Sequence, residues 1–167
     1  MNNWARLITL CSFLLIISNN AMARGNTAYE ETYNVGLLAG QISGDAEHGD
    51  ADATGFILSA RNQKAILEYV SAKADGGVLA SGGSWESNIS GLYLSLLGTG
   101  QPYMKFKVGK IKQEMIKDDG IAVTTNTNDI TSYGIGLGYK MGSRIKLEFE
   151  VTTLDNDMTL MAVSVLF

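Results

Sequence analysis

Cysteine is almost absent from this 167-residue sequence, because the single cysteine, Cys11, lies in an apolar run near the N-terminus. Proline is equally scarce, with Pro102 alone, and His48 is the only histidine. The fold therefore cannot depend on disulfides, which small exported domains commonly use. Acidic residues outnumber basic ones, 17 to 13, and this disfavours nucleic-acid binding, which needs a surface rich in positive charge.

A long hydrophobic run is also lacking. The sequence begins with a short polar start that carries Arg6, continues with an apolar run from Leu7 to Ile17, and then reads Ala21-Met22-Ala23. The run is shorter than the roughly 20 residues that a membrane-spanning helix needs. It therefore predicts a signal peptide over residues 1–23, cut after Ala23, rather than an anchor. The remaining residues, 24–167, contain no cysteine and have the length of one domain.

What the sequence does contain is alternation of apolar and small or charged residues. In "SYGIGLGYKMGSRIKLEFEV", residues 132–151, large apolar side chains occupy every second position, and glycines, lysines and glutamates stand between them. This period of two over adjacent runs predicts a β-hairpin. Alternation alone leaves two architectures open. The apolar row points inward in a soluble sandwich or lipocalin, and outward at lipid in a membrane barrel.

Alternating runs follow one another along the chain and predict eight strands. They cover residues 33–42, 54–62, 64–73, 87–97, 103–113, 132–141, 144–154 and 158–167. Most have about the 9 to 11 residues with which a tilted strand crosses a bilayer. The connections alternate between short turns and longer polar loops at 43–53, 74–86 and 114–131. This layout is typical of outer-membrane barrels, whose short turns face the periplasm.

The chain ends "MTLMAVSVLF" on Phe167, with apolar residues at alternate positions before it: Met161, Val163 and Val165. This ending resembles the C-terminal signal that the barrel-assembly machinery recognises in outer-membrane proteins. Together with the hairpin at 132–151, it makes the chain resemble the OmpA/OmpX-like family of small barrels. The resemblance implies an all-β fold, an eight-stranded antiparallel up-and-down transmembrane β-barrel, in the outer membrane of a Gram-negative bacterium.

If Phe167 faces lipid, the same parity gives every strand an outer and an inner row. Outer rows hold leucines and aromatics, and inner rows hold glycine, serine and charged side chains. A soluble barrel could not place so many charges in its core, since unpaired buried charges are costly. The inner charges predict a salt-bridged network formed by Arg61, Glu68, Lys105, Lys107, Lys140, Lys146, Glu148 and Glu150. An eight-stranded barrel has room inside only for its own side chains, which favours a closed lumen over a polar path for solutes.

Two more lysines, Lys110 and Lys112, fall on the outer row late in the strand predicted at 103–113. They are candidates for contact with lipopolysaccharide phosphates, or else mark where the strand has left the membrane. The resemblance implies lipid, lipopolysaccharide and the barrel-assembly machinery as partners. An external ligand could bind the three long loops.

Catalytic chemistry is poorly represented. His48 lies in "GDAEHGDAD" among acidic residues, with no serine spaced to share a strand face with it. The acidic spacing does not match a calcium-binding loop, so a solvated surface loop is favoured over a cation site. We therefore predict no catalytic residue, no metal and no cofactor. The expected function is a non-enzymatic barrel that supports envelope integrity or binds a partner. A narrow porin-like channel is the alternative, and an enzyme acting on outer-membrane lipid comes third.

Overall fold

The structure, a computed structural model, describes residues 32–44, 47–62, 65–142, 144–154 and 158–167. The predicted signal peptide, residues 1–23, lies outside these ranges. Eight strands make up the described chain: β1 (Thr32–Ser43), β2 (Ala51–Asn62), β3 (Ala65–Val78), β4 (Ser84–Leu97), β5 (Tyr103–Asp118), β6 (Val123–Met141), β7 (Ile145–Thr153) and β8 (Thr159–Leu166). Across the described ranges, no helix has the length and apolar composition needed to cross a membrane.

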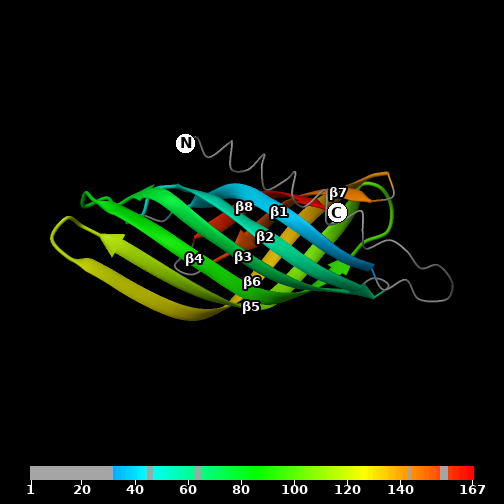
Figure 1. Cartoon of the computed structure of the whole chain (residues 1–167), viewed down its shortest axis with the longest axis horizontal. Coiled ribbons are helices and arrows are strands. Elements are labelled where there is room, and N and C mark those ends of the chain that lie inside the picture. Colours follow the sequence, from blue (N-terminus) through cyan, green and yellow to red (C-terminus); the bar gives the residue numbers. More distant parts are fainter. Residues whose placement is uncertain (1–31, 45–46, 63–64, 143, 155–157) are drawn as a thin grey trace.

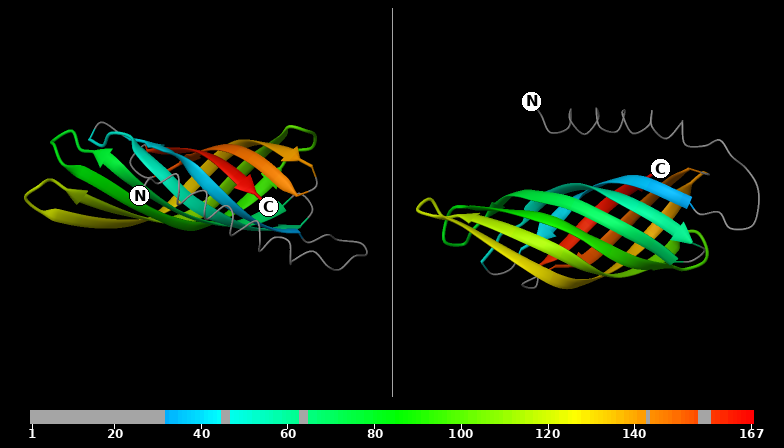
Figure 2. Two further views of the ribbon diagram at one scale, coloured as in Figure 1. Left: turned by 45° about the horizontal axis from the view of Figure 1, so that its top comes forward. Right: turned by 60° about the horizontal axis from the view of Figure 1, so that its bottom comes forward.

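The strands form one closed antiparallel barrel in sequence order, from β1 to β8 and back to β1 (Figure 1). Pairing of β1 with β8 runs from Gly36 opposite Leu166 to Ser43 opposite Thr159. Two backbone hydrogen bonds between Val35 and Phe167 extend the same seam. The strands are inclined to the long axis of the barrel (Figure 2). Closure pairs the sheet edges, and the predicted eight-stranded barrel is confirmed.

The two ends of the barrel differ. We call the "turn end" the end that carries Phe167 and the connections at 98–102 and 142–144, which lies to the right in Figure 1. The "loop end" is the opposite end, with the connections at 44–50, 79–83, 119–122 and 154–158. At the loop end β5 and β6 form the hairpin that extends furthest, to the left in Figure 1.

The prediction of long loops at 74–86 and 114–131 is wrong. Residues 74–78 and 84–86 belong to β3 and β4, and 114–118 and 123–131 belong to β5 and β6. The loop predicted at 43–53 likewise shortens to 44–50, because β2 begins at Ala51. Polar residues occupy both faces of β6 over 124–129, so the alternation on which the sequence prediction relies is missing there.

The outer surface carries the predicted apolar rows. Phe56, Leu67, Leu92, Phe106 and Phe149 are among the large apolar side chains that are exposed there. Outward positions further toward the loop end are polar, such as Ser71, Lys73, Asn88, Lys110 and Lys112. We call the apolar zone the "belt". It consists of Val35, Leu37, Phe56, Leu58, Leu67, Tyr69, Leu92, Leu94, Leu96, Met104, Phe106, Val108, Tyr133, Ile135, Leu137, Tyr139, Leu147, Phe149, Val151, Met161, Val163, Val165 and Phe167.

The inner surface reverses this order. Inside the belt many inward side chains are polar or charged, as with Glu68, Lys105 and Glu150. Ile66 and Leu97 are exceptions, because they form a small buried cluster with Tyr103 at this level. Inside the polar zone the inward side chains are mostly apolar, as with Trp85 and Ile111. The prediction of an inner row that is small or charged almost throughout therefore fits most of the part of the barrel that the belt surrounds, but it does not fit the polar zone.

Candidate functional site: the charged lumen

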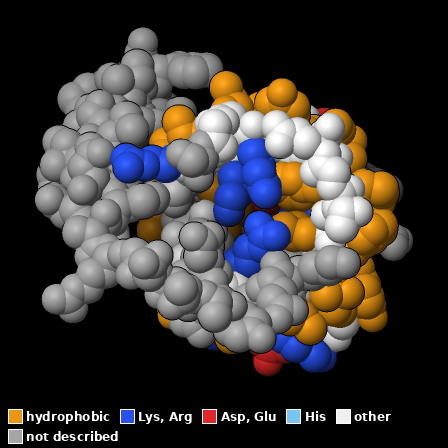
Figure 3. Space-filling view, turned by 90° about the vertical axis from the view of Figure 1, so that its right-hand side faces the viewer, with side chains coloured by type: hydrophobic (Ala, Val, Ile, Leu, Met, Phe, Trp, Pro, Cys, Tyr) orange, Lys and Arg blue, Asp and Glu red, His pale blue; other side chains and the backbone are white. Residues whose placement is uncertain are grey.

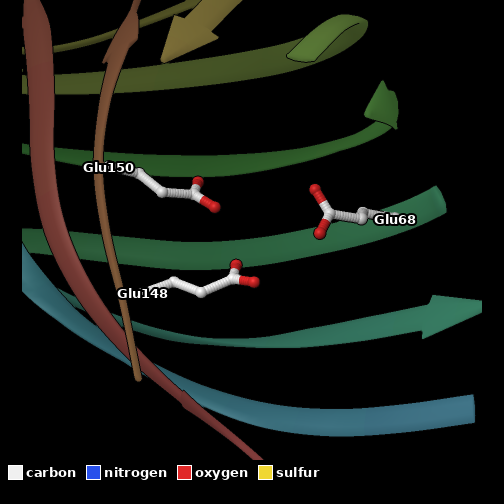
Figure 4. Close-up of side chains that lie close together, drawn as sticks. All are labelled: Glu68, Glu148 and Glu150. Carbon is white, nitrogen blue, oxygen red and sulfur yellow. The ribbon is translucent and has the colours of Figure 1, made fainter. Parts of the chain in front are cut away.

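Five charged side chains meet in the lumen within the belt. Three carboxylates point toward one another, Glu68 from β3 and Glu148 and Glu150 from β7 (Figure 4). The ammonium of Lys105, on β5, lies 2.5 Å from Glu68 Oε1 and 2.7 Å from Glu148 Oε2, and it also pairs with Glu150. Lys107 pairs with the other oxygen of Glu150. This arrangement crosses the lumen from one wall to the other.

Glu68 and Glu148 each also accept a hydrogen bond from a hydroxyl group. Ser95 Oγ donates to Glu68 Oε2 at 2.7 Å, and Tyr103 OH donates to Glu148 Oε1 at 2.5 Å. Lys107 Nζ lies 4.6 Å from the ring centroid of Tyr93, within range of a cation–π interaction. The network is nearly dry, since Lys105, Glu68 and Glu150 expose 1%, 1% and 2% of their surfaces. Removing one partner of such a buried pair typically costs about 3–5 kcal/mol.

The three carboxylates alone would suit a cation. Their ligand oxygens lie within 4.8 Å of one another, close enough for a single metal ion. The Lys105 ammonium, however, contacts all three acids and supplies the positive charge itself. The chain therefore neutralises this acidic cluster with its own lysine.

Glycines on β6 make room for the network. A Cβ at Gly134 would lie 2.6 Å from Lys107 Cε, and one at Gly136 would lie 2.9 Å from Glu150 Cγ. A Cβ at Gly138 would overlap the ring of Tyr103. The inward row of β6 is thus kept free of side chains because long side chains from β5 and β7 fill that space.

The remaining predicted lumen charges lie closer to the turn end. Lys146 Nζ donates to Asn34 Oδ1 at 2.9 Å, and Asn34 in turn donates to Ser59. Arg61 and Lys140 are near enough to Lys146 to repel it electrostatically, and Lys140 is its direct partner in the ladder. Basic side chains gather inside this opening (Figure 3). The structure brings five of the eight predicted residues into one ion-pair network and places these other three beside it.

Beyond the charged zone the lumen is filled by apolar side chains. Leu38, Ile42, Ile57, Val70, Ile89, Ile111, Met115, Met158 and Leu160 form one buried cluster together with Trp85 and several alanines. The Trp85 side chain is fully buried, and its indole Nε1 donates to the carbonyl of Gly49 at 3.1 Å. We call this cluster, with Trp85, the "apolar plug".

His48 covers the apolar plug at the loop end. Its ring packs edge-on against Trp85, with centroids 5.7 Å apart, and only 2% of the residue is exposed. Residues 47–49 are held by backbone bonds from Gly49 to Val78 and from Ala80 to Glu47. The prediction of a solvated loop fits Glu47, Asp50 and Asp52, which are exposed, but it is wrong for His48, whose imidazole is buried against the indole.

Solved structures share this barrel. The sequence matches no family model and no curated protein. The N-terminal β-barrel domain of Pseudomonas aeruginosa OprF aligns with a TM-score of 0.63 at 11% identity, over 84% of this chain and 98% of that one. Neisserial surface protein A gives 0.59 at 9% identity, over 80% and 94%. Ail of Yersinia pestis, solved with the heparin analogue sucrose octasulfate, gives 0.57 at 11% identity, over 84% and 97%.

The chain has the fold of the small OmpA/OmpX-like outer-membrane barrels. At these identities the likeness concerns the fold alone, so residue roles must come from this chain.

The other predicted residues lie on the outer surface of the barrel. Lys110 and Lys112 are exposed on β5, immediately beyond Val108 at the edge of the belt, and Lys112 is the ladder partner of Asp129. Met161, Val163 and Val165 follow one another on the outward row of β8, and Phe167 comes directly after the end of that strand. Recognition of that row by the barrel-assembly machinery stays a prediction.

Sequence reasoning missed the apolar plug. The signal was present, since Trp85, Ser87, Ile89 and Tyr93 share one face of β4. The strand predicted from the sequence begins at residue 87, whereas β4 begins at Ser84, so the prediction omits Trp85. Burial of His48 had no sequence signal, because it depends on contacts between connections that are distant in the chain.

Proposed function

We propose that this chain is a non-enzymatic barrel of a Gram-negative outer membrane, with a closed lumen, that supports the envelope or binds partners at the cell surface. In this orientation the turn end faces the periplasm and the loop end faces outside, as in other outer-membrane barrels. The belt would contact lipid.

The observation that carries the proposal is that buried side chains occupy the lumen at two successive levels. Lys105 and its three carboxylates fill the lumen inside the belt, and the apolar plug fills it beyond. A hydrated ion could pass only if both the ion-pair network and the apolar plug opened. Rearrangement of the ion pairs alone would leave the apolar plug in place. The narrow-channel alternative is therefore disfavoured.

An external ligand fits the same proposal. Ail, a barrel of the same fold, was solved in complex with sucrose octasulfate. For this chain the residues available outside are those of the loop end. Lys110 and Lys112 would lie at the level of lipopolysaccharide phosphates, just beyond the belt.

Conductance in planar bilayers tests closure. Purified protein that folds, as judged by heat-modifiable migration in detergent, should give no stable current steps. Simultaneous replacement of Lys105 by Met and Trp85 by Ala should be needed before any appear. Regular ion-selective steps from the unchanged protein would refute a closed lumen and favour the channel.

Localisation and processing can be tested separately. The protein should fractionate with outer membranes, and the mass of the purified chain should correspond to a start at Arg24. A chain that is soluble without detergent would contradict the membrane assignment, whereas a different N-terminus would contradict only the cleavage site.

A further inference from the structure

Three basic side chains converge at the turn end of the lumen. Arg61 comes from the end of β2, Lys140 from the end of β6 and Lys146 from the start of β7. Lys140 and Lys146 are opposite one another in the β6–β7 ladder, and Arg61 is near enough to repel Lys146. Figure 3 looks into this opening and shows basic side chains inside it. We call these three residues the "basic mouth".

Negative charge is scarce at this level of the barrel. In the ranges that the structure describes, the inward carboxylates within the belt are those of the ion-pair network. Glu148 attracts Lys146, but Lys105 and Tyr103 already contact its carboxylate. Of the eight charges predicted to face the lumen, five are basic and three are acidic, which leaves an excess of two positive charges. Like charges directly opposite one another destabilise a sheet, so a bound anion would stabilise the basic mouth.

Apolar side chains border the basic mouth. Ile66 is the ladder partner of Arg61, and Leu166 is that of Lys146. Both apolar residues are buried, and Leu97 packs with Ile66 in the same small cluster. Water screens charges less well beside an apolar wall than on an open surface. The three cations should therefore attract an anion more strongly than dispersed surface lysines do.

Neighbouring polar groups hold parts of the basic mouth in place. Lys146 Nζ donates to Asn34 Oδ1 at 2.9 Å, which uses one of the three donors of the ammonium. Asn34 is fixed in turn, because its amide donates to Ser59 Oγ at 3.2 Å. The carbonyl of Lys140 accepts a bond from Gln101 Nε2 at 2.8 Å, which ties the neighbouring turn to β6. A preformed site of this kind lowers the entropic cost of binding a ligand.

We propose that the basic mouth binds the phosphate group of a small dissolved molecule. A guanidinium matches the oxygens of a phosphate group, and the two ammonium groups add point charges beside it. A phosphate dianion also balances the excess of two positive charges, whereas a carboxylate or a chloride ion balances only one. Binding itself does not depend on the proposed function. Only the compartment does, because the turn end faces the periplasm in that orientation.

The test measures binding of inorganic phosphate to the full folded protein in dodecyl maltoside, a detergent without phosphorus. Isothermal titration calorimetry should give a dissociation constant of about 1 mM or lower. Lys146→Gln should raise this constant about tenfold, and adding Lys140→Gln should raise it further. The matched control is the double variant Lys73→Gln and Lys117→Gln. It removes the same charge near the loop end and should bind phosphate as the unchanged protein does.

NMR spectroscopy of the same samples supplies a readout of position. The side-chain amide resonances of Asn34 should shift on titration with phosphate, because its oxygen accepts a bond from Lys146. The indole resonance of Trp85 should not shift, because that side chain lies in the apolar plug. If Lys146→Gln fails to show heat-modifiable migration, Lys140→Gln alone replaces it, since Lys140 is exposed.

A lipid headgroup could supply the same chemistry, and a water-soluble phospholipid, dihexanoyl phosphatidylglycerol, distinguishes this source. Its phosphodiester carries one negative charge, so it should bind more weakly than inorganic phosphate. Equal or tighter binding of the phospholipid would overturn the choice of a small dissolved molecule.

Three results would overturn the proposal as a whole: a dissociation constant above about 1 mM, equal weakening by the control variant, or resonance shifts confined to the loop end. Binding that appears only after Glu30→Gln and Glu31→Gln would overturn the choice of ligand, because it would show that the chain's own carboxylates compete for the basic mouth. None of these results bears on conductance or on fractionation with outer membranes, which test the proposed function separately.

Discussion

Replacing Lys105 by Met should destabilise the barrel strongly. The change removes the cation that contacts Glu68, Glu148 and Glu150 together. Glu150 keeps Lys107, whereas Glu68 and Glu148 retain only the hydroxyls of Ser95 and Tyr103. With carboxylates buried and uncompensated, the free energy of unfolding should fall by about 3–5 kcal/mol.

Urea unfolding in lipid vesicles measures this effect, with tryptophan fluorescence as the signal. The sequence has two tryptophans, and cleavage after Ala23 would leave Trp85 as the only one. Lys110→Met is the matched control, because Lys110 is exposed outside the barrel. It should change the free energy of unfolding by no more than about 0.5 kcal/mol.

A rescue variant separates charge from shape. Adding Glu68→Gln and Glu148→Gln to Lys105→Met removes the uncompensated charges while keeping side-chain volume, and should restore most of the lost stability. The reasoning is refuted if Lys105→Met resembles Lys110→Met, or if the triple variant is no more stable than Lys105→Met alone.

Three further outcomes are expected. Gly138→Ala should lower the free energy of unfolding in urea by about 1–3 kcal/mol, because the added methyl overlaps Tyr103. Gly98→Ala should lower it by less, because a Cβ at Gly98 meets only ordinary contacts of 3.4 Å or more. Trp85→Ala should lower the free energy of unfolding by about 3–5 kcal/mol, as measured by heat-modifiable migration. It should nevertheless give no conductance while the ion-pair network remains. Replacing Lys110 and Lys112 by Gln should weaken binding of purified lipopolysaccharide and reduce its salt dependence, without changing heat-modifiable migration; unchanged binding would remove these lysines from the proposal.

The predictable part of the fold is the part inside the belt. There the environment differs sharply between the two faces of a strand, so Phe106 and Phe149 alternate with Lys105, Lys107 and Glu150. The pattern identifies the strands, their lipid-facing sides and the residues of the ion-pair network. The pattern does not show which residues form ion pairs with each other. The partners of Lys105 come from β3 and β7, so they depend on the shear of the barrel.

Prediction was less successful beyond the belt. Over 123–129 both faces of β6 meet water, so the residues carry no alternation and resemble a loop. The strand persists there because β5 continues beside it, as the pairing of Asn126 with Met115 illustrates. Burial of His48 likewise arises from contacts between residues 47–49 and the β3–β4 connection, which no local pattern records.

The reversal of polarity along the lumen has a thermodynamic consequence. Outside the belt the barrel has an apolar interior and a wet exterior, as a water-soluble domain does, and its unfolding would expose Trp85, Ile89 and Met115 to water. Within the belt the apolar side chains lie outward, where lipid would keep them from water in any inserted state. The positive heat-capacity change of unfolding should therefore come mainly from the loop end. Cooling should weaken the packing there while leaving the ion-paired zone comparatively unaffected.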